Sequence, residues 1–125
     1  MQLQPLWGEN MKALNFSAGR CQFLLLNRSK TCTIRLGDKT DSYAEGDIVY
    51  ITYEKKNLGK VRLYSAYIDK VVVKPVADLT SEDLLSESPE LKNVEDFVSW
   101  SAGIYQQEIC LTDLVTVFYY SEIIE

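Results

Sequence analysis

The chain has 125 residues, 46% of them hydrophobic and 25% charged, which fits one soluble globular domain and excludes a wholly disordered, collagen-like or coiled-coil chain. It has no histidine, which excludes Ser-His-Asp and Cys-His nucleophilic sites and zinc sites built on imidazole. The net charge is −5, with an excess of Lys and Arg within residues 28–74 and of Asp and Glu within residues 76–113; this balance argues against duplex DNA as a partner but allows a local basic cleft.

A short strand and a helix are expected at the start of the domain. Residues 1–10 show no clear period and are interpreted as an N-terminal extension or arm, with a single domain over residues 11–125. Partial alternation predicts a strand over residues 11–16. Ser17 is a suitable cap for a helix, which the turn-forming residues 27–29 then end.

Strands dominate the middle of the chain. Clean alternation predicts a strand over residues 31–36, with apolar and polar side chains on opposite faces. Residues rich in β-branched and aromatic side chains predict a strand over 48–53 and, over 61–74, either one long strand or two strands joined by a bend near Asp69. Turns that contain Gly separate these strands, and Pro75 ends the last of them.

Two short helices and a closing strand complete the pattern. Thr80 is the expected N-cap of the first helix, with Asp83 as its capping-box partner, and Pro89 ends this helix. Asn93 starts the second helix, and residues 114–120 form the last strand. Because regular βαβ alternation is missing, this order predicts an α+β fold, a small and mostly antiparallel β-barrel with flanking short helices.

The cysteines and the hydropathy pattern bear on the compartment. Cys21, Cys32 and Cys110 form no Cys-x-x-Cys pair and are odd in number, so we expect reduced, mostly buried thiols and no structural zinc. No apolar run approaches the roughly 20 residues of a membrane helix, and no signal peptide is visible. We therefore expect a cytoplasmic protein with no membrane partner, and no metal or organic cofactor is implied.

The most distinctive pattern lies in residues 28–38, where cations and hydroxyls gather around one turn and one strand. The polar face of the expected strand presents Thr31, Thr33 and Arg35, and Lys30 stands at its start. From pattern alone, the simplest interpretation is the solvated outer face of a half-buried strand. Strand packing does not require cations beside these hydroxyls, so a binding or catalytic site is the alternative interpretation.

This stretch resembles the signature of the ASCH family, a branch of the PUA-like superfamily, whose domains carry a Gly-x-Lys-Thr-x-Thr-Ile-Arg type of segment. Residues 28–35 match that segment but lack the usual Gly before the Lys. Two further landmarks follow in order: a Gly-Asp turn before a strand at residues 46–49, and a Leu-Thr-x-Glu-Asp segment at residues 79–83. The resemblance covers nearly the whole chain and implies a PUA-like β-barrel with a cleft beside the strand over residues 31–36.

The resemblance also implies a function, because ASCH domains are proposed to bind RNA or nucleotide-like ligands in this cleft. We therefore expect binding of RNA or of a modified nucleoside or nucleotide, with Lys30 and Arg35 supplying positive charge and Thr33 a hydrogen bond. The ligand-binding residues expected besides Lys30 and Thr33 are the other polar side chains of the stretch: Arg28, Thr31, Arg35 and Lys39.

An enzyme is the alternative, because a few small members of the family resemble amidohydrolases that act on acetylated cytidine. Their catalytic Lys, Thr and downstream Glu match Lys30 and Thr33 by motif and Glu87 by spacing. A Lys desolvated by burial can lose its proton near neutral pH and accept the proton of the Thr33 hydroxyl, which then attacks the acyl carbon. Glu87 then protonates the leaving amine, and Arg35 holds the oxyanion.

Strand geometry sets a condition on this alternative. In a regular strand Lys30 and Thr33 point to opposite faces, so they meet only if Lys30 lies in the turn or the strand bends at its start. The third alternative is a protein-interaction module, which would present an exposed apolar patch in place of a working cleft.

Overall fold

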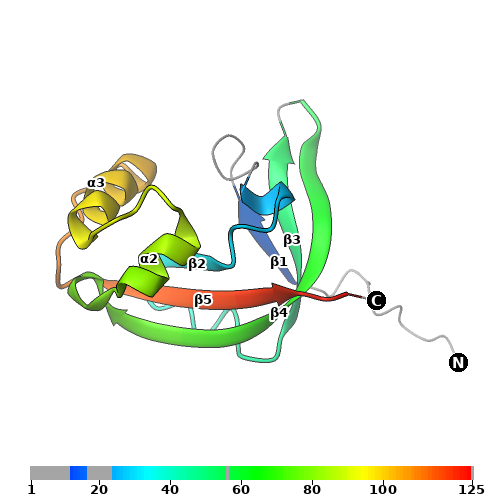
Figure 1. Cartoon of the computed structure of the whole chain (residues 1–125), viewed down its shortest axis with the longest axis horizontal. Helices are drawn as coiled ribbons and strands as arrows, with labels where there is room; N and C mark the ends of the chain where they lie inside the picture. Colours follow the sequence, from blue (N-terminus) through cyan, green and yellow to red (C-terminus); the bar gives the residue numbers. More distant parts are fainter. Residues whose placement is uncertain (1–11, 17–23, 56, 125) are drawn as a thin grey trace, which may run out of the picture.

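The computed structural model describes residues 12–16, 24–55 and 57–124. Within these residues the chain forms strands β1 to β5, a short 3-10 helix η1 and the α-helices α2 and α3, and residues 24–26 are also helical (Figure 1). Their bounds are β1 Lys12–Phe16, β2 Cys32–Leu36, β3 Ile48–Lys55, β4 Gly59–Pro75, η1 Val76–Asp78, α2 Ser81–Glu87, α3 Val94–Tyr105 and β5 Leu114–Glu122. None of the helices in these ranges has the length and hydropathy of a membrane span.

The strands form one sheet in the order β1-β3-β4-β5-β2. The β1–β3 pair is parallel, and the β3–β4, β4–β5 and β5–β2 pairs are antiparallel. The sheet curls into a half-barrel, and α2 and α3 lie at the end of the sheet that carries β2 (Figure 1). The predicted α+β class, with a mostly antiparallel sheet and flanking short helices, is confirmed.

Of the two predictions for residues 61–74, one long strand is observed, β4, with an irregularity at Asp69. Its pairing with β5 shifts register between Ile68 and Lys70, so Asp69 is the extra residue of a bulge. A bulge bends its strand and increases the local twist. β4 therefore pairs with β3 through its first part and with β5 through its second part, and this long bent strand carries the curl of the sheet.

The core has two parts, one on each face of the sheet. Inside the curl, a cluster joins strands β1, β3, β4 and β5 and includes Leu14, Phe16, Ile51, Phe118 and Tyr120. On the other face, a second cluster lies between the β2–β5 pair and the helices, and we call it the helix-side cluster. It includes Cys32, Ile34, Leu84, Phe97 and Val117. The alternation of β2 therefore sends its apolar side chains toward the helices and Thr33 toward the inside of the curl.

The helix boundaries follow local sequence signals. The Thr80 hydroxyl accepts from the Asp83 backbone N–H at 3.0 Å, and the Asp83 carboxylate accepts from the Thr80 N–H at 3.0 Å. This reciprocal pair is the predicted capping box. The Asn93 side chain caps α3 by accepting from the Asp96 N–H at 2.8 Å. Both caps satisfy backbone donors that a helix start leaves unpaired.

Gly46 and Gly103 give a matched pair of predictions for stability. Gly46 has a φ of +86°, and a Cβ added there would meet nothing within 4 Å, so Gly46→Ala is expected to cost roughly 1–2 kcal/mol through backbone strain alone. Gly103 lies inside α3 with equally open space, so Gly103→Ala is expected to stabilise the protein by up to about 1 kcal/mol. Urea unfolding measures both, and shifts in the same direction would contradict this account.

The cysteines only partly follow expectation. Cys32 is buried in the helix-side cluster, whereas Cys110 is exposed; Cys21 lies outside the described residues. The expectation of mostly buried thiols therefore fails at Cys110, which sits in the loop before β5. Burial raises the pKa of the Cys32 thiol to about 12, and the thiolate is the reactive form.

Alkylation of the native protein should separate these two thiols. We expect iodoacetamide at mildly alkaline pH to modify Cys110 within minutes and Cys32 only after unfolding, because Cys32 is both inaccessible and protonated. Peptide mapping by mass spectrometry reads out each cysteine separately. Equal rates at Cys32 and Cys110 in the folded protein would show that the helix-side cluster opens readily.

Candidate functional site

A buried ion pair joins Lys30 to Glu87, which lie 57 residues apart in the chain. The Lys30 Nζ contacts the Glu87 Oε1 and also donates to the Glu87 backbone carbonyl at 2.9 Å. Each residue is only 2% exposed. Charged side chains are almost never buried to this extent unless they are paired, and the pair costs free energy to desolvate. Such an arrangement is therefore a candidate functional site.

The end of α2 is bonded to β2, an edge strand of the sheet, and to the residue that precedes it. The second carboxylate oxygen of Glu87, Oε2, accepts from the Ile34 backbone N–H at 2.7 Å. The Ser86 carbonyl, at the end of α2, accepts from the Thr31 N–H at 3.3 Å. The last turn of α2 thus satisfies donors that an edge strand would otherwise leave open. The Glu87 carboxylate consequently lies against the strand that carries Thr33.

Lys30 precedes β2, which begins at Cys32, and lies in a short stretch of irregular backbone after a turn. That turn includes Arg28 with a φ of +63°. The Lys30 carbonyl accepts from the Tyr120 hydroxyl at 3.0 Å, which fixes this stretch against β5. Strand alternation therefore does not apply to Lys30, and it does not force the Lys30 side chain to the face opposite Thr33.

Thr33 and Arg35 form the other half of the cluster, inside the curl. Thr33 is 4% exposed, and its hydroxyl accepts from the Arg35 Nε at 3.3 Å. Arg35 also donates from its second terminal nitrogen to the Asn15 carbonyl at 3.0 Å, which links β2 to β1 across the open side of the curled sheet. Thr33 and Arg35 share a face as the sequence predicts, whereas Thr31, predicted on the same face, lies before β2 and is exposed.

The ring of Phe16 brings the two halves together. The Lys30 Nζ lies 5.4 Å and the Arg35 guanidinium carbon 5.2 Å from the centroid of this ring. Both distances fall within the range of cation–π contacts. Sequence reasoning missed Phe16, because it reads there as an ordinary apolar strand residue. We call Lys30, Thr33, Arg35 and Glu87 with this ring the Lys30–Glu87 site.

The remaining predicted ligand-binding residues lie elsewhere on the surface. Arg28 makes two hydrogen bonds to the Glu122 carboxylate, at 2.9 and 3.2 Å, and its guanidinium lies 4.2 Å from the Tyr64 ring centroid. Thr31 is exposed and makes its hydrogen bonds to Ser86 and Tyr120 through the backbone. Lys39 is exposed in the loop after β2, where its N–H donates to the Thr116 hydroxyl at 2.9 Å.

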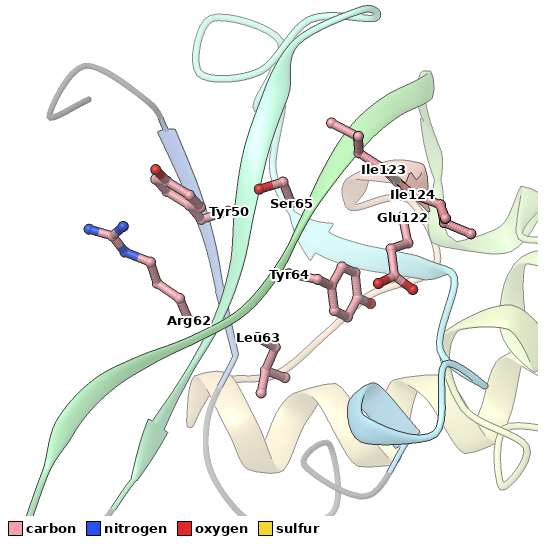
Figure 2. Close-up of a pocket in the computed structure, with 8 residues that line it drawn as sticks. All are labelled: Tyr50, Arg62, Leu63, Tyr64, Ser65, Glu122, Ile123 and Ile124. Carbon is pink, nitrogen blue, oxygen red and sulfur yellow. The ribbon is translucent and has the colours of Figure 1, made fainter. Parts of the chain in front are cut away.

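A separate open pocket of about 520 Å³ lies over β3, β4 and the end of β5. Figure 2 shows Arg62 extending beside Tyr50, and the Tyr64 ring near the Glu122 carboxylate. The Arg62 guanidinium lies 4.3 Å from the Tyr50 ring centroid. The pocket lining does not include Lys30, Thr33 or Glu87; it consists of Tyr50, Arg62, Leu63, Tyr64, Ser65, Glu122, Ile123 and Ile124.

Within the described ranges, no three Cys, Asp or Glu side chains gather closely enough to hold a metal ion. The Lys30–Glu87 site brings together an ammonium, a carboxylate, a hydroxyl and a guanidinium group. These are a candidate base, acid, nucleophile and anion-binding group within one cluster.

Comparison with known proteins bears on the fold. No family model matches the sequence, and no curated protein matches it. Solved structures do match. An ASCH domain from Lactobacillus crispatus JV V101 has a TM-score of 0.58 and 16% identity over 90% of this chain and 79% of its own. Protein EF3133 from Enterococcus faecalis V583, described as DUF984, has a TM-score of 0.62 and 16% identity over 84% of this chain and 68% of its own.

A third solved structure, the hypothetical protein PH0355, has a TM-score of 0.59 and 18% identity over 87% of this chain and 97% of its own. Each match spans most of the curled sheet and its helices, and the identities are low enough that they speak for the fold alone. The order of landmarks in the sequence and these structural matches agree. The chain therefore has the α+β fold of an ASCH domain.

Proposed function

We propose that this protein is an amidohydrolase that removes the acyl group from an N-acylated, cytidine-like nucleoside. The observation that carries the proposal is the direct contact of Lys30 with Glu87, both buried, with the Glu87 carboxylate bonded to β2, the strand that carries Thr33. The sequence resemblance implies these three residues as a catalytic set, with Glu87 supported by spacing only. Their assembly from two distant segments is what an acid–base site needs and what a solvated strand face does not require.

The ion pair supplies an acid and a base through one proton transfer. When the Lys30 ammonium passes a proton to the Glu87 carboxylate, it becomes a neutral amine and Glu87 a carboxylic acid. The amine can then accept the proton of the Thr33 hydroxyl, and the acid can donate to the leaving nitrogen. Burial excludes water and strengthens both interactions. The substrate must displace the side chains that cover Thr33, which is only 4% exposed.

The remaining steps balance with water as the second reactant. The Thr33 oxygen attacks the acyl carbon, and the oxyanion that forms is stabilised by the Arg35 guanidinium, which already donates to the Thr33 hydroxyl. The C–N bond breaks as Glu87 protonates the nitrogen, leaving an acyl ester on Thr33. Water, deprotonated by the same pair, hydrolyses the ester and releases the carboxylic acid.

The second candidate function is binding of RNA or of a nucleoside without turnover. Pairing of the local cations with carboxylates counts against binding of RNA. Lys30 in the site is paired with Glu87, and Arg28, which lies outside the site, is paired with Glu122. Tight nonspecific RNA binding needs cations that neutralise phosphates along a track, and the net charge of the chain is −5. A single nucleoside places no such demand, which favours a small substrate.

The first test is turnover of N4-acetylcytidine to cytidine, followed by chromatography. We expect the wild-type protein to release cytidine, and Glu87→Gln to slow release by roughly 100-fold or more, because an amide cannot donate the proton that the carboxylic acid does. Glu82→Gln, on the exposed face of the same helix, is the matched control and should keep full activity.

A second assay separates the binding candidate. No cytidine from the folded wild-type protein, together with saturable binding of a single-stranded RNA that weakens steeply with salt, would reject the hydrolase and favour RNA binding. Binding of the nucleoside without turnover would favour a nucleoside-binding site and reject the catalytic roles of Lys30, Thr33 and Glu87. Wild-type turnover with equal rates in Glu87→Gln would reject Glu87 as the acid.

A further inference from the structure

Helix α2 is tied to the sheet at its start by Asp83, which is 5% exposed. One carboxylate oxygen of Asp83 accepts from the Lys74 Nζ at 2.8 Å and from the Thr80 N–H at 3.0 Å. The other accepts from the Tyr119 hydroxyl at 2.5 Å. A capping box needs only the bond to Thr80. The two bonds from β4 and β5 are therefore additional, and they fix where the helix sits on the sheet.

The protonation states of Asp83 and Tyr119 maintain the hydrogen bonds that join α2 to the sheet. Although burial alone would raise the pKa of Asp83, the hydrogen bonds from Lys74 and Tyr119 outweigh it and hold that pKa below its usual range. Burial and the bond to Asp83 raise the pKa of Tyr119. Asp83 is thus a carboxylate acceptor and Tyr119 a hydroxyl donor across the neutral pH range.

Asp83 and Glu87 are four residues apart on one short helix, so they project from the same face. Both are buried, and both bond the sheet: Asp83 through β4 and β5, Glu87 through the Ile34 N–H of β2. The other contacts of α2 include the packing of Leu84 in the core and the bond of the Ser86 carbonyl to the Thr31 N–H. A shift at Asp83 would therefore move the Glu87 carboxylate away from Lys30 and Ile34.

We propose that Asp83, held by Tyr119 and Lys74, is the positioning residue that sets the Glu87 carboxylate against Lys30 for the reaction. This inference rests on the proposed function for its catalytic consequence, although the placement of Glu87 can be measured without turnover. The Ile34 amide is the reporter, because its hydrogen bond ends on Glu87. The Leu36 amide is the internal control, because on the same edge it donates to the Tyr105 hydroxyl of α3 at 3.1 Å.

The experiment uses Tyr119→Phe, which removes one hydroxyl and leaves the ring and the capping box, with Lys74→Met as a second variant. Amide hydrogen exchange by NMR should become about tenfold faster at Ile34, equivalent to roughly 1.4 kcal/mol, while Leu36 stays within about twofold of wild type. In the N4-acetylcytidine assay, kcat should fall about tenfold with KM unchanged, as expected when a catalytic group is misplaced and substrate binding is kept.

The outcomes separate the two proposals. Equal acceleration at Ile34 and Leu36, or none at either, overturns the positioning role, because the first is general destabilisation and the second shows that Glu87 has not moved. Faster exchange confined to Ile34 in a protein that never turns over the substrate supports the positioning of Glu87 and rejects the hydrolase. Faster exchange at Ile34 with an unchanged kcat would show that the position of Glu87 set by Asp83 does not affect the reaction. This result would overturn the catalytic part of the proposal.

Discussion

Replacing Lys30 with Met is expected to lower the free energy of unfolding by about 3–5 kcal/mol, because the Glu87 carboxylate then stays buried without its counter-ion. Met has a similar length and no charge, so the change removes the ion pair with little change in volume. Glu87 is 2% exposed and cannot reach water without moving α2. Urea unfolding followed by far-UV circular dichroism measures the loss.

Two further proteins decide how this loss is interpreted. Lys60→Met, at the exposed start of β4, is the matched control and should change stability by less than about 0.5 kcal/mol. Lys30→Met combined with Glu87→Leu should recover part of the loss, leaving about 1–3 kcal/mol because the Ile34 N–H no longer has its carboxylate acceptor. A Lys30→Met protein as stable as the Lys60→Met control would contradict the buried pair.

The largest effect on activity is expected from Thr33→Val, which should slow the hydrolysis of N4-acetylcytidine by at least about a thousandfold through loss of the nucleophile. Val has nearly the shape of Thr, so the fold should survive. The stability cost should be about 1 kcal/mol, from the lost acceptor of the Arg35 Nε. The measurement is the initial rate of cytidine release at substrate concentrations above and below KM.

Conservative and distant variants sharpen this prediction. Thr33→Ser keeps a hydroxyl and should retain measurable turnover, whereas Thr112→Val, in the exposed turn before β5, should behave as wild type. If Thr33→Val and wild type hydrolyse the substrate equally fast, the Thr33 oxygen does not form the acyl ester. Water activated directly by the Lys30–Glu87 pair would then be the nucleophile.

Local sequence signals predict most of the fold. The capping box of α2, the Asn93 cap of α3, the end of β4 at Pro75 and the bend at Asp69 each depend on a few neighbouring residues, and each appears as expected. The resemblance to ASCH domains predicts the curled sheet, and the solved structures confirm that fold. The expected helix capped by Ser17 lies mainly outside the described residues, within which residues 24–26 are helical.

The site is harder to predict, because its contacts join segments that are distant in the chain. The resemblance implies a shared site for Lys30 and Thr33, whereas regular strand alternation would place them on opposite faces. Glu87 follows only from its distance past the Leu-Thr landmark, and no local rule places a helix end against an edge strand. The Arg28–Glu122 pair, 94 residues apart, is equally invisible to sequence reasoning.

The central claim is that Lys30, Thr33 and Glu87 act as one hydrolytic unit. The most direct test compares initial rates of N4-acetylcytidine hydrolysis by wild type, Thr33→Val, Glu87→Gln and the double variant, each verified as folded. Groups that act as a unit lose nearly everything at the first substitution, so the double variant should be no more than about threefold slower than the slower single variant. Losses that multiply, or a folded wild type that releases no cytidine, would contradict the claim.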